Sequence, residues 1–274
     1  MVSIDGKTIR GTVDLANPRG DHLLAAYLPE EGIVLFQVEA GSKENEITVA
    51  PKLLEGIDLR GKVVVGDAAH TQRKLSVQIQ EAGGDYLWFA KDNQPTLRED
   101  IEQLFEGDNR TVLGGRVPND FRRVRRVGKG HGRRESREIT VSSELKGYSD
   151  WPGLEQVFKL ERHRIRCKDG KEEQEIVYGL TSLSQAEASP ERLLHLSRTY
   201  WGIENGLHHR RDVTFQEDST RQTCGHAGRV MAAINNLVIS LLRHTSATNL
   251  AQARRQCDAN PVQTLSLLIA SPIT

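Results

Sequence analysis

The sequence predicts an α/β fold in which a mixed sheet is flanked by helices and interrupted by a β-rich insertion. Two observations carry this prediction. Apolar runs of strand length alternate with helical periodicity over residues 1–106, and a polar, strand-like stretch then intervenes before helical periodicity returns. We therefore divide the 274 residues into a first core segment (1–106), a β-rich insertion (107–185) and a helical completion of the core (186–274).

The first core segment opens with three predicted strands. An apolar run at residues 2–4 ends in Asp5. Two further runs, at 23–28 and 33–38, are separated by the turn-forming sequence PEEG, which predicts a hairpin. Residues 44–57 then have helical spacing, with acidic residues near their start.

Strand and helix alternate over the rest of this segment. The run KVVVG is typical of a strand buried on both faces, and it stops at Asp67. A helix over 71–82, a strand over 85–90 and a helix over 96–105 follow. This order of elements resembles the ribonuclease H-like fold, in which the first and fourth strands are neighbours at the centre of the sheet.

That topology predicts two adjacent carboxylates. Asp5 on the first strand and Asp67 at the end of the fourth would lie side by side at the edge where open α/β sheets bind ligands. Two carboxylates this close repel each other unless a cation lies between them. Ligation by oxygen alone favours Mg²⁺ or Mn²⁺ over zinc.

The insertion carries a strongly basic segment. Strand-like runs at 137–145, 154–167 and 172–183 are separated by turns, and residues 116–137 hold nine basic and two acidic side chains. Glycines within this segment would let the backbone approach a phosphate closely. The composition favours contact with nucleic acid; a solvated charged surface is the alternative. The basic residues are Arg116, Arg122, Arg123, Arg125, Arg126, Lys129, Arg133, Arg134 and Arg137.

Helix signals and reactive side chains coincide at residues 189–218. Ser189 followed by proline and glutamate is typical of a helix start. Glu204 flanks an apolar stripe, with His208 one turn and Asp212 two turns beyond it, so the three side chains could border one cleft. The stripe consists of Leu193, Leu196, Tyr200, Ile203 and Leu207. A second helix, over 229–243, has a stripe of Val230, Ile234, Leu237, Val238 and Leu241, and shorter helices are expected after it.

Composition excludes several classes of protein. No stretch approaches the length of apolar residues that spans a membrane, and no secretory signal opens the chain. The three cysteines are odd in number and far apart, which indicates a reducing cytoplasm and no disulfide framework. The formal net charge is zero, so a polyanionic partner would have to be bound by a local basic patch.

Five stretches together resemble DDE transposases of bacterial insertion sequences, in the group that includes the H-repeat-associated proteins. They are IDGKTIRG around Asp5, GDAAHTQ around Asp67, GGDYLWFAKDNQPTL, GHGRRESRE, and YWGIENGLHHRRDVTFQED around Glu204. The resemblance implies a catalytic core that cleaves and joins DNA strands at insertion-sequence ends. It implies that Asp5, Asp67 and Glu204 are catalytic and hold divalent metal, two Mg²⁺ or Mn²⁺ ions.

The resemblance also implies partners and a location. The partners are double-stranded DNA, as terminal repeats and as target, and a second copy of the chain on that DNA. The location is the bacterial cytoplasm, at the nucleoid when DNA is bound. Members of the group have a further N-terminal region, whereas this sequence begins four residues before Asp5. We therefore expect an N-terminally short copy, with a non-catalytic DNA-binding remnant as the alternative function.

Eight residues are predicted to contact DNA. Lys7 and Arg10 flank Asp5; Lys91, Asn93 and Gln94 follow the strand over 85–90; Arg133 and Arg137 belong to the basic segment; and His208 follows Glu204. For the residues near Asp5 and after the strand over 85–90, the alternative is a surface position without a role. For the two arginines, the alternative is a salt bridge to Glu135 or Glu138. For His208, the alternative is support of Glu204.

Three other interpretations are weaker. Zinc bound by His208, His209, Cys224 and His226 matches no common ligand spacing. A ribonuclease H-type nuclease would lack both the insertion and the YWGIEN helix. Trp201 could stack on an unpaired base, although a core position is favoured.

Overall fold

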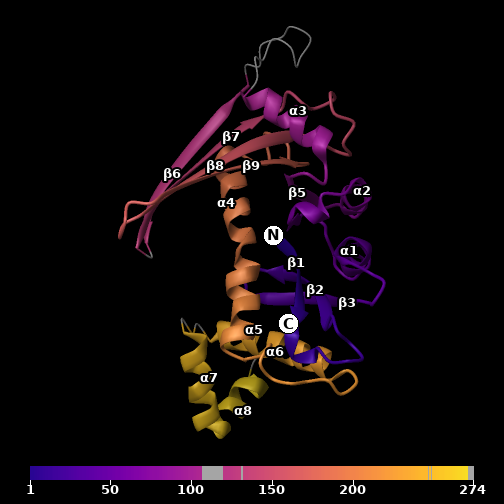
Figure 1. The fold of residues 1–274 in the computed structure, drawn as a ribbon, viewed down its shortest axis with the longest axis vertical. Helices are drawn as coiled ribbons and strands as arrows, with labels where there is room; N and C mark the ends of the chain where they lie inside the picture. Colours follow the sequence, from indigo (N-terminus) through magenta and orange to yellow (C-terminus); the bar gives the residue numbers. More distant parts are fainter. Residues whose placement is uncertain (107–119, 131, 246, 248, 271–274) are drawn as a thin grey trace. The chain divides into compact units, whose positions relative to one another are not determined.

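A computed structural model of the chain describes residues 1–106, 120–130, 132–245, 247 and 249–270. The start of the predicted insertion, with Arg116, lies outside the described residues. The chain forms two compact units (Figure 1). The central unit comprises Met1–Val2 and Asp58–Tyr200, and the terminal unit comprises Ser3–Ile57 and Trp201–Thr274.

The terminal unit is built on an antiparallel meander. Strand β1 (Val2–Ile9) pairs with β2 (Asp21–Leu28), and β2 pairs with β3 (Ile33–Ala40), which confirms the predicted hairpin. Helix α1 (Glu46–Glu55) contacts β2 and β3 and begins at a capping box formed by Asn45 and Thr48. The predicted helix in this region is therefore confirmed.

Strand β1 continues for four residues beyond Asp5, so it is longer than the apolar run from which it was predicted. The polar residues after Asp5 have partners on both faces of the meander. Gly6 lies against α1, where an added Cβ would stand 2.2 Å from Glu46 Oε1. Thr8 Oγ1 lies 2.8 Å from His22 Nδ1 on that same face. These tertiary contacts extend a strand that its own sequence favours only at its start.

Helix α6 (Ala227–His244) covers the other face of the meander. Helix α4 (Pro190–Tyr200) belongs to the central unit; after it come the π-helical turn η3 (Glu204–His208), α5 (His209–Val213), α6, α7 (Leu250–Ala259) and α8 (Pro261–Ala270). Helix α6 contacts β2 and β3. The predicted helix over 229–243 and the shorter helices after it are thus confirmed. Within the described residues, no helix combines the length and apolarity needed to cross a membrane.

The buried face of α6 is not the predicted stripe. Val230, Ile234 and Leu237 are exposed, whereas Asn235 and Asn236 are buried. Asn236 Nδ2 donates to Gln37 Oε1 of β3 at 2.8 Å, and Asn235 Nδ2 donates to Glu217 Oε1 at 3.2 Å. The helix orients these amide side chains toward acceptors on β3 and in the turn after α5, because buried amide groups destabilise the fold when they lack a hydrogen bond.

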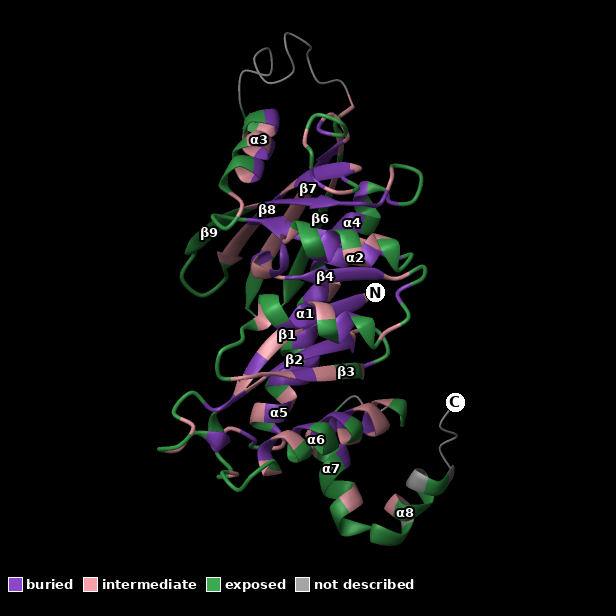
Figure 2. Cartoon of the chain, turned by 90° about the vertical axis from the view of Figure 1, so that its right-hand side faces the viewer, coloured by how far each residue is buried: buried purple, intermediate pink, exposed green. Residues whose placement is uncertain are grey.

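The central unit contains a parallel pair extended by an antiparallel sheet. Strand β4 (Val63–Gly66) and strand β5 (Asp85–Ala90) are parallel and are joined through η2 (Ala68–His70) and α2 (Arg73–Glu81). Helix α3 (Pro95–Glu106) follows β5. All four predictions for residues 63–106 are confirmed, and every residue of β4 is buried (Figure 2).

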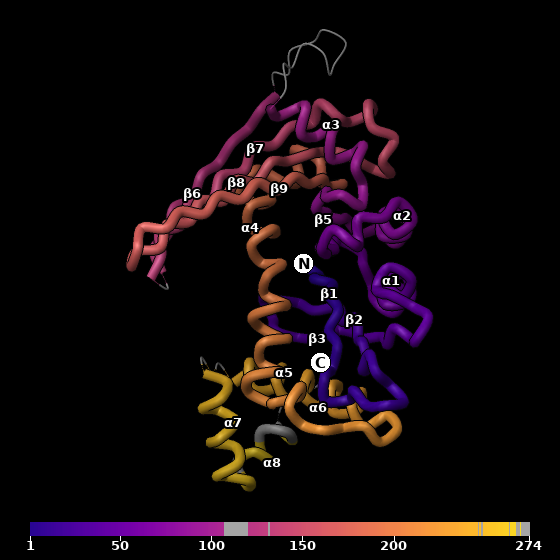
Figure 3. The backbone as a smooth tube through the Cα atoms, in the orientation of Figure 1, coloured from indigo at the N-terminus to yellow at the C-terminus, as the bar shows by residue number. Residues whose placement is uncertain are grey.

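Strands of the predicted insertion continue this sheet. Strands β6 (Arg122–Gly130), β7 (Arg133–Ser142), β8 (Gln156–Arg166) and β9 (Glu172–Thr181) form an antiparallel meander, and β9 also pairs with β5. At the far end of this meander Arg133 is opposite Arg166, and the backbone N–H of Cys167 donates to the Gly132 carbonyl at 2.8 Å, so the start of β7 and the end of β8 lie together (Figure 3). Helix α4 packs against β4, β6 and β7. A mixed α/β fold with helices on its strands is confirmed; the ribonuclease H-like topology and the three-segment division remain predictions.

A buried ion pair fixes the turn after α5. Arg211 Nη2 lies 2.8 Å from Glu217 Oε2, and both side chains are fully buried. Between them Gln216 has a φ of 54°, in the left-handed region that non-glycine residues seldom adopt. The ion pair therefore holds a turn that its own backbone preferences disfavour.

We expect Glu217→Gln to lower the free energy of unfolding by about 3 to 5 kcal/mol, because it leaves the Arg211 charge buried without its counter-ion. Urea denaturation followed by circular dichroism measures this loss. Glu55→Gln, at an exposed carboxylate of α1, is the control. Equal stability of the two variants would contradict a structural role for the pair.

Candidate active site

Strand alternation brings Asp5 and Lys7 to the same face of the meander. Asp5 is opposite Ala25 and Lys7 is opposite Leu23, so both side chains lie on the face that carries Leu23. Leu23 packs with Ile9 and with Ala232 of α6 on that face. The side chains of Asp5 and Lys7 therefore point to the helical segment that begins with Glu204.

Asp5 lies between two side chains of η3. His208 Nε2 is 3.2 Å from Asp5 Oδ2, and His208 is only 5% exposed. Glu204 is exposed as a residue, but its carboxyl group is partly buried and close to Asp5. Burial, followed by the negative charge of Asp5, raises the pKa of Glu204; His208 and Lys7 oppose this effect. Two carboxylates and a histidine thus meet where the sequence predicted a cleft.

Glu204 begins a π-helical turn. The backbone N–H of His209 donates to the carbonyl of Glu204, which closes a ring one residue wider than that of an α-helix. Gly206 allows this turn to approach β2, since an added Cβ would stand 2.7 Å from the Tyr27 hydroxyl oxygen. Ile203 and Leu207 are buried, as the predicted apolar stripe requires. Such π turns occur frequently at functional sites.

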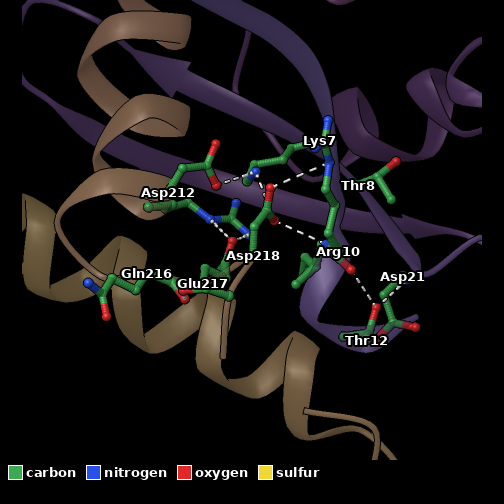
Figure 4. Close-up of polar contacts among 12 residues, drawn as sticks. Lys7, Thr8, Arg10, Thr12, Asp21, Asp212, Gln216, Glu217 and Asp218 are labelled. Atoms are coloured by element: carbon green, nitrogen blue, oxygen red, sulfur yellow. Dashed lines mark hydrogen bonds and ion pairs between the residues drawn. The ribbon is translucent and has the colours of Figure 1, made fainter. Parts of the chain in front are cut away.

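Lys7 is held by two carboxylates of the segment after Glu204 (Figure 4). Its Nζ lies 2.5 Å from Asp212 Oδ1 and 3.3 Å from Asp218 Oδ1, and its side chain is 8% exposed. Asp218 also accepts a hydrogen bond from the backbone N–H of Arg10 at 3.0 Å. This environment argues against the predicted DNA contact of Lys7 and favours a positioning role. The Arg10 side chain is exposed, as a DNA contact requires.

Asp67 belongs to the central unit, directly after β4. Its carboxylate caps η2 by accepting the N–H of Ala69 at 2.9 Å, and His70 Nε2 lies 3.9 Å from it. The predicted DNA-contacting amides support this turn instead. Asn93 Nδ2 donates to the Ala68 carbonyl at 2.6 Å, and Gln94 Nε2 donates to the Thr71 carbonyl at 2.9 Å. Both donors are thus engaged within the protein and fix the backbone beside Asp67.

The other predicted contact residues differ in their surroundings. Lys91 and Arg133 are exposed. Arg137 pairs with Glu135 at 2.8 Å, which was the alternative to phosphate binding. Buried His208 is next to Asp5, which favours its role beside Glu204 over contact with DNA. Trp201 is 44% exposed, so the core position favoured for it is wrong.

The chemistry of the Asp5 and Glu204 pair fits a hard divalent cation. A cation would relieve the repulsion that raises the pKa of Glu204, and carboxylate oxygens are ligands that Mg²⁺ and Mn²⁺ prefer. Across the described residues, no three Asp, Glu, His or Cys side chains are arranged so that together they could hold a metal ion. Asp5 and Glu204 are therefore a partial ligand set, to which further oxygen ligands would have to be added.

Comparison with known proteins identifies the class as a transposase. The chain belongs to the family described as Transposase DDE domain, whose sequence model matches residues 2–241. This confirms the family resemblance inferred from the five motifs.

Three of the relatives, all from Escherichia coli, match most of this chain. "Putative protein YbfL" of strain K12 is 31% identical over 247 residues, which are 88% of this chain and 64% of that protein. "H repeat-associated putative transposase YhhI" of strain K12 is 30% identical over 255 residues, 88% of this chain and 64% of that protein. "Putative transposase YncI" of strain O157:H7 is 31% identical over 248 residues, 89% and 62% respectively. The chain thus spans slightly less than two thirds of these relatives.

Sequence reasoning missed two features of the site. It did not assign a partner to Asp218, although the run QED within the last motif placed that acid next to Glu217. It also did not pair Arg211 with Glu217. No local pattern distinguished this pair, because residues 208–218 are mostly polar and charged and Arg211 and Glu217 lie among several other charged residues.

The raised pKa of Glu204 predicts how stability depends on pH. The folded protein binds the proton of the Glu204 carboxyl group more tightly than the unfolded chain does. The free energy of unfolding therefore falls as the pH rises above the ordinary glutamate pKa of 4.5. We expect Glu204→Gln to be more stable than wild type at neutral pH, and the difference to vanish below about pH 4. Thermal unfolding across this pH range measures it.

Glu191→Gln provides a control of opposite sign. Hydrogen bonds from its own backbone and from Ser189 lower the pKa of Glu191. Its carboxylate therefore stabilises the fold at pH values above the ordinary glutamate pKa of 4.5, and the variant should be less stable than wild type at neutral pH. A Glu204→Gln protein that is less stable than wild type at neutral pH would contradict repulsion between Glu204 and Asp5.

Lys7→Met tests the positioning role of the buried ammonium group. We expect a loss of about 2 to 3 kcal/mol, because Asp218 and the half-exposed Asp212 lose their shared counter-ion. The double variant Lys7→Met/Asp218→Asn should lose less than the sum of the two single variants, as contacting charges do. Chemical denaturation measures both, with the exposed Lys43→Met as control. Additive losses would show that the two residues are not coupled.

Proposed function

We propose that this chain is the catalytic region of a transposase that cleaves and transfers DNA strands at the ends of an insertion sequence. The observation that carries the proposal is the acidic pair on β1 and η3, in a chain that belongs to the DDE transposase family. The raised pKa of Glu204 marks a carboxylate in an environment that disfavours its charge, and such residues cluster at functional sites.

Asp5, Asp67 and Glu204 serve together in this proposal as ligands of two Mg²⁺ or Mn²⁺ ions. When bound, the ions supply activation of the attacking water or DNA 3′-hydroxyl and stabilisation of the leaving oxygen. The chain's own residues orient the ligands. His208 supports Asp5, and the amide side chains of Asn93 and Gln94 fix the turn that carries Asp67.

The proposed substrate is double-stranded DNA, as terminal repeats and as target. Exposed Arg10, Lys91 and Arg133 are offered as backbone contacts, since arginine and lysine charges supply the sequence-independent part of DNA binding. A second copy of the chain on the DNA and a cytoplasmic location complete the proposal. The second candidate function is a DNA-binding remnant of a transposase that does not cleave.

Nicking of supercoiled plasmid, with and without Mg²⁺ or Mn²⁺, tests the function. We expect metal-dependent nicking by wild type and a loss of roughly two to three orders of magnitude in Asp5→Asn, Asp67→Asn and Glu204→Gln, because each removes a charged metal ligand. Glu55→Gln should nick as wild type does. Well-folded wild type that binds DNA without nicking it would favour the remnant.

A further inference from the structure

The face of the β6–β9 sheet that packs on α4 carries arginines in register. Arg126 is opposite Arg137, and Arg137 is opposite Arg162, so three guanidinium groups from three adjacent strands share one face. Like charges directly opposite each other destabilise a sheet unless something neutralises them. Glu175 lies 3.3 Å from Arg162 and therefore neutralises the arginine on β8.

One carboxylate is shared by Arg137 and by Arg164, which lies outside this row. Glu135 lies 2.8 Å from Arg137 and 3.1 Å from Arg164, and its side chain is largely buried. Burial lowers the pKa of Arg137; Glu135 opposes that effect, whereas the nearby charges of Arg198, Arg162 and Arg164 add to it. The positive charge at Arg137 is therefore incompletely balanced, and an additional anion would stabilise it.

A cavity of about 300 Å³ opens at this place. Four arginines line it, three from β6 and β7 and one, Arg198, from α4, together with Glu135. Gly128 and Gly130 also line it, and an added Cβ at either would meet nothing within 4 Å. The cavity is thus lined by bare backbone and guanidinium groups, together with Val127, Lys129 and the carboxylate of Glu135. The four arginines are Arg126, Arg133, Arg137 and Arg198.

We propose that this cavity binds a backbone phosphate of DNA, held by Arg133, Arg137 and Arg198. Guanidinium groups donate paired hydrogen bonds that match the oxygens of a phosphate, and they keep their charge at every physiological pH. No aromatic side chain lines the cavity among the described residues. The site therefore positions DNA without reading its sequence.

The proposal rests on the proposed function, because DNA as the substrate follows from it, and it adds a residue that sequence reasoning did not select. Arg198 precedes Glu204 by six residues in the chain, at the end of the same helical stretch. A phosphate bound by Arg198 would therefore be linked through α4 to the segment that carries the proposed catalytic glutamate.

Two adjacent arginines make a matched test. Arg133 lines the cavity, whereas the side chain of Arg134 points to the opposite face of the same strand; both are exposed. We expect Arg133→Gln and Arg198→Gln each to weaken binding of a short DNA duplex about fivefold to tenfold, and to reduce the slope of log affinity against log salt by about one. Arg134→Gln should change affinity less than about twofold and leave the slope unchanged. Fluorescence anisotropy over a series of KCl concentrations measures both quantities.

Inorganic phosphate separates the cavity from DNA binding in general. Phosphate should raise the melting temperature of wild type above that in chloride of the same ionic strength, and the Arg133→Gln/Arg198→Gln variant should lose this increase. Equal effects of Arg133→Gln and Arg134→Gln on DNA binding would overturn the proposal, since the charge would then act diffusely. Phosphate binding that depends on these arginines, with unchanged DNA binding, would assign the cavity to a free anion and would also overturn it.

The plasmid assay distinguishes this proposal from the proposed function. Wild type that nicks plasmid, while Arg133→Gln and Arg198→Gln bind DNA normally, would overturn the phosphate site alone. Wild type that fails to nick, but whose DNA binding depends on Arg133 and Arg198 and not on Arg134, would support the phosphate site and reject catalysis.

Discussion

The arrangement of the terminal unit depends on one buried ammonium group. Lys7 lies two residues from Asp5 on the same face of β1, and its two carboxylate partners both follow Glu204 in the chain. The ion pairs therefore join segments that are more than two hundred residues apart in sequence. Because Asp5 and Glu204 repel each other, their proximity requires attraction nearby, and Lys7 provides it. A cation-binding site can thus exist in the folded chain before any cation is bound.

Like charges are gathered at two places, one acidic and one basic. In the terminal unit Asp5 raises the pKa of Glu204, and in the central unit three arginines oppose one another across β6, β7 and β8. Neither arrangement stabilises the isolated fold, and uncompensated charge of this kind is expected at sites that bind a ligand of opposite sign. A divalent cation and a phosphate diester are the two ligands that strand transfer on DNA would bring together.

The sequence predicted elements well where periodicity and end signals agreed, as for β4, which stops at Asp67, and for the hairpin of β2 and β3. It failed where distant contacts decide. The extent of β1 depends on Gly6 against Glu46, and the buried face of α6 depends on acceptors in β3 and beside α5. Strand order predicted Asp5 beside Asp67, whereas motif resemblance linked Asp5 with Glu204, the acid that lies close to it. The partners of Lys7 were not predictable, since no local pattern records a contact across so many residues.

The π turn explains how Glu204, His208 and Asp212, on one helical segment, all lie beside side chains of β1. In an α-helix, a step of four residues rotates the side chain by about 400° around the helix axis, which is about 40° more than a full turn. Successive side chains four residues apart are therefore displaced around the axis in the same direction. In the wider π turn, four residues fall short of a full circle. The step from Glu204 to His208 is π-helical and the step to Asp212 is α-helical, so the two displacements have opposite signs. Because the displacements offset each other, Glu204 and His208 stay beside Asp5 while Asp212 reaches Lys7.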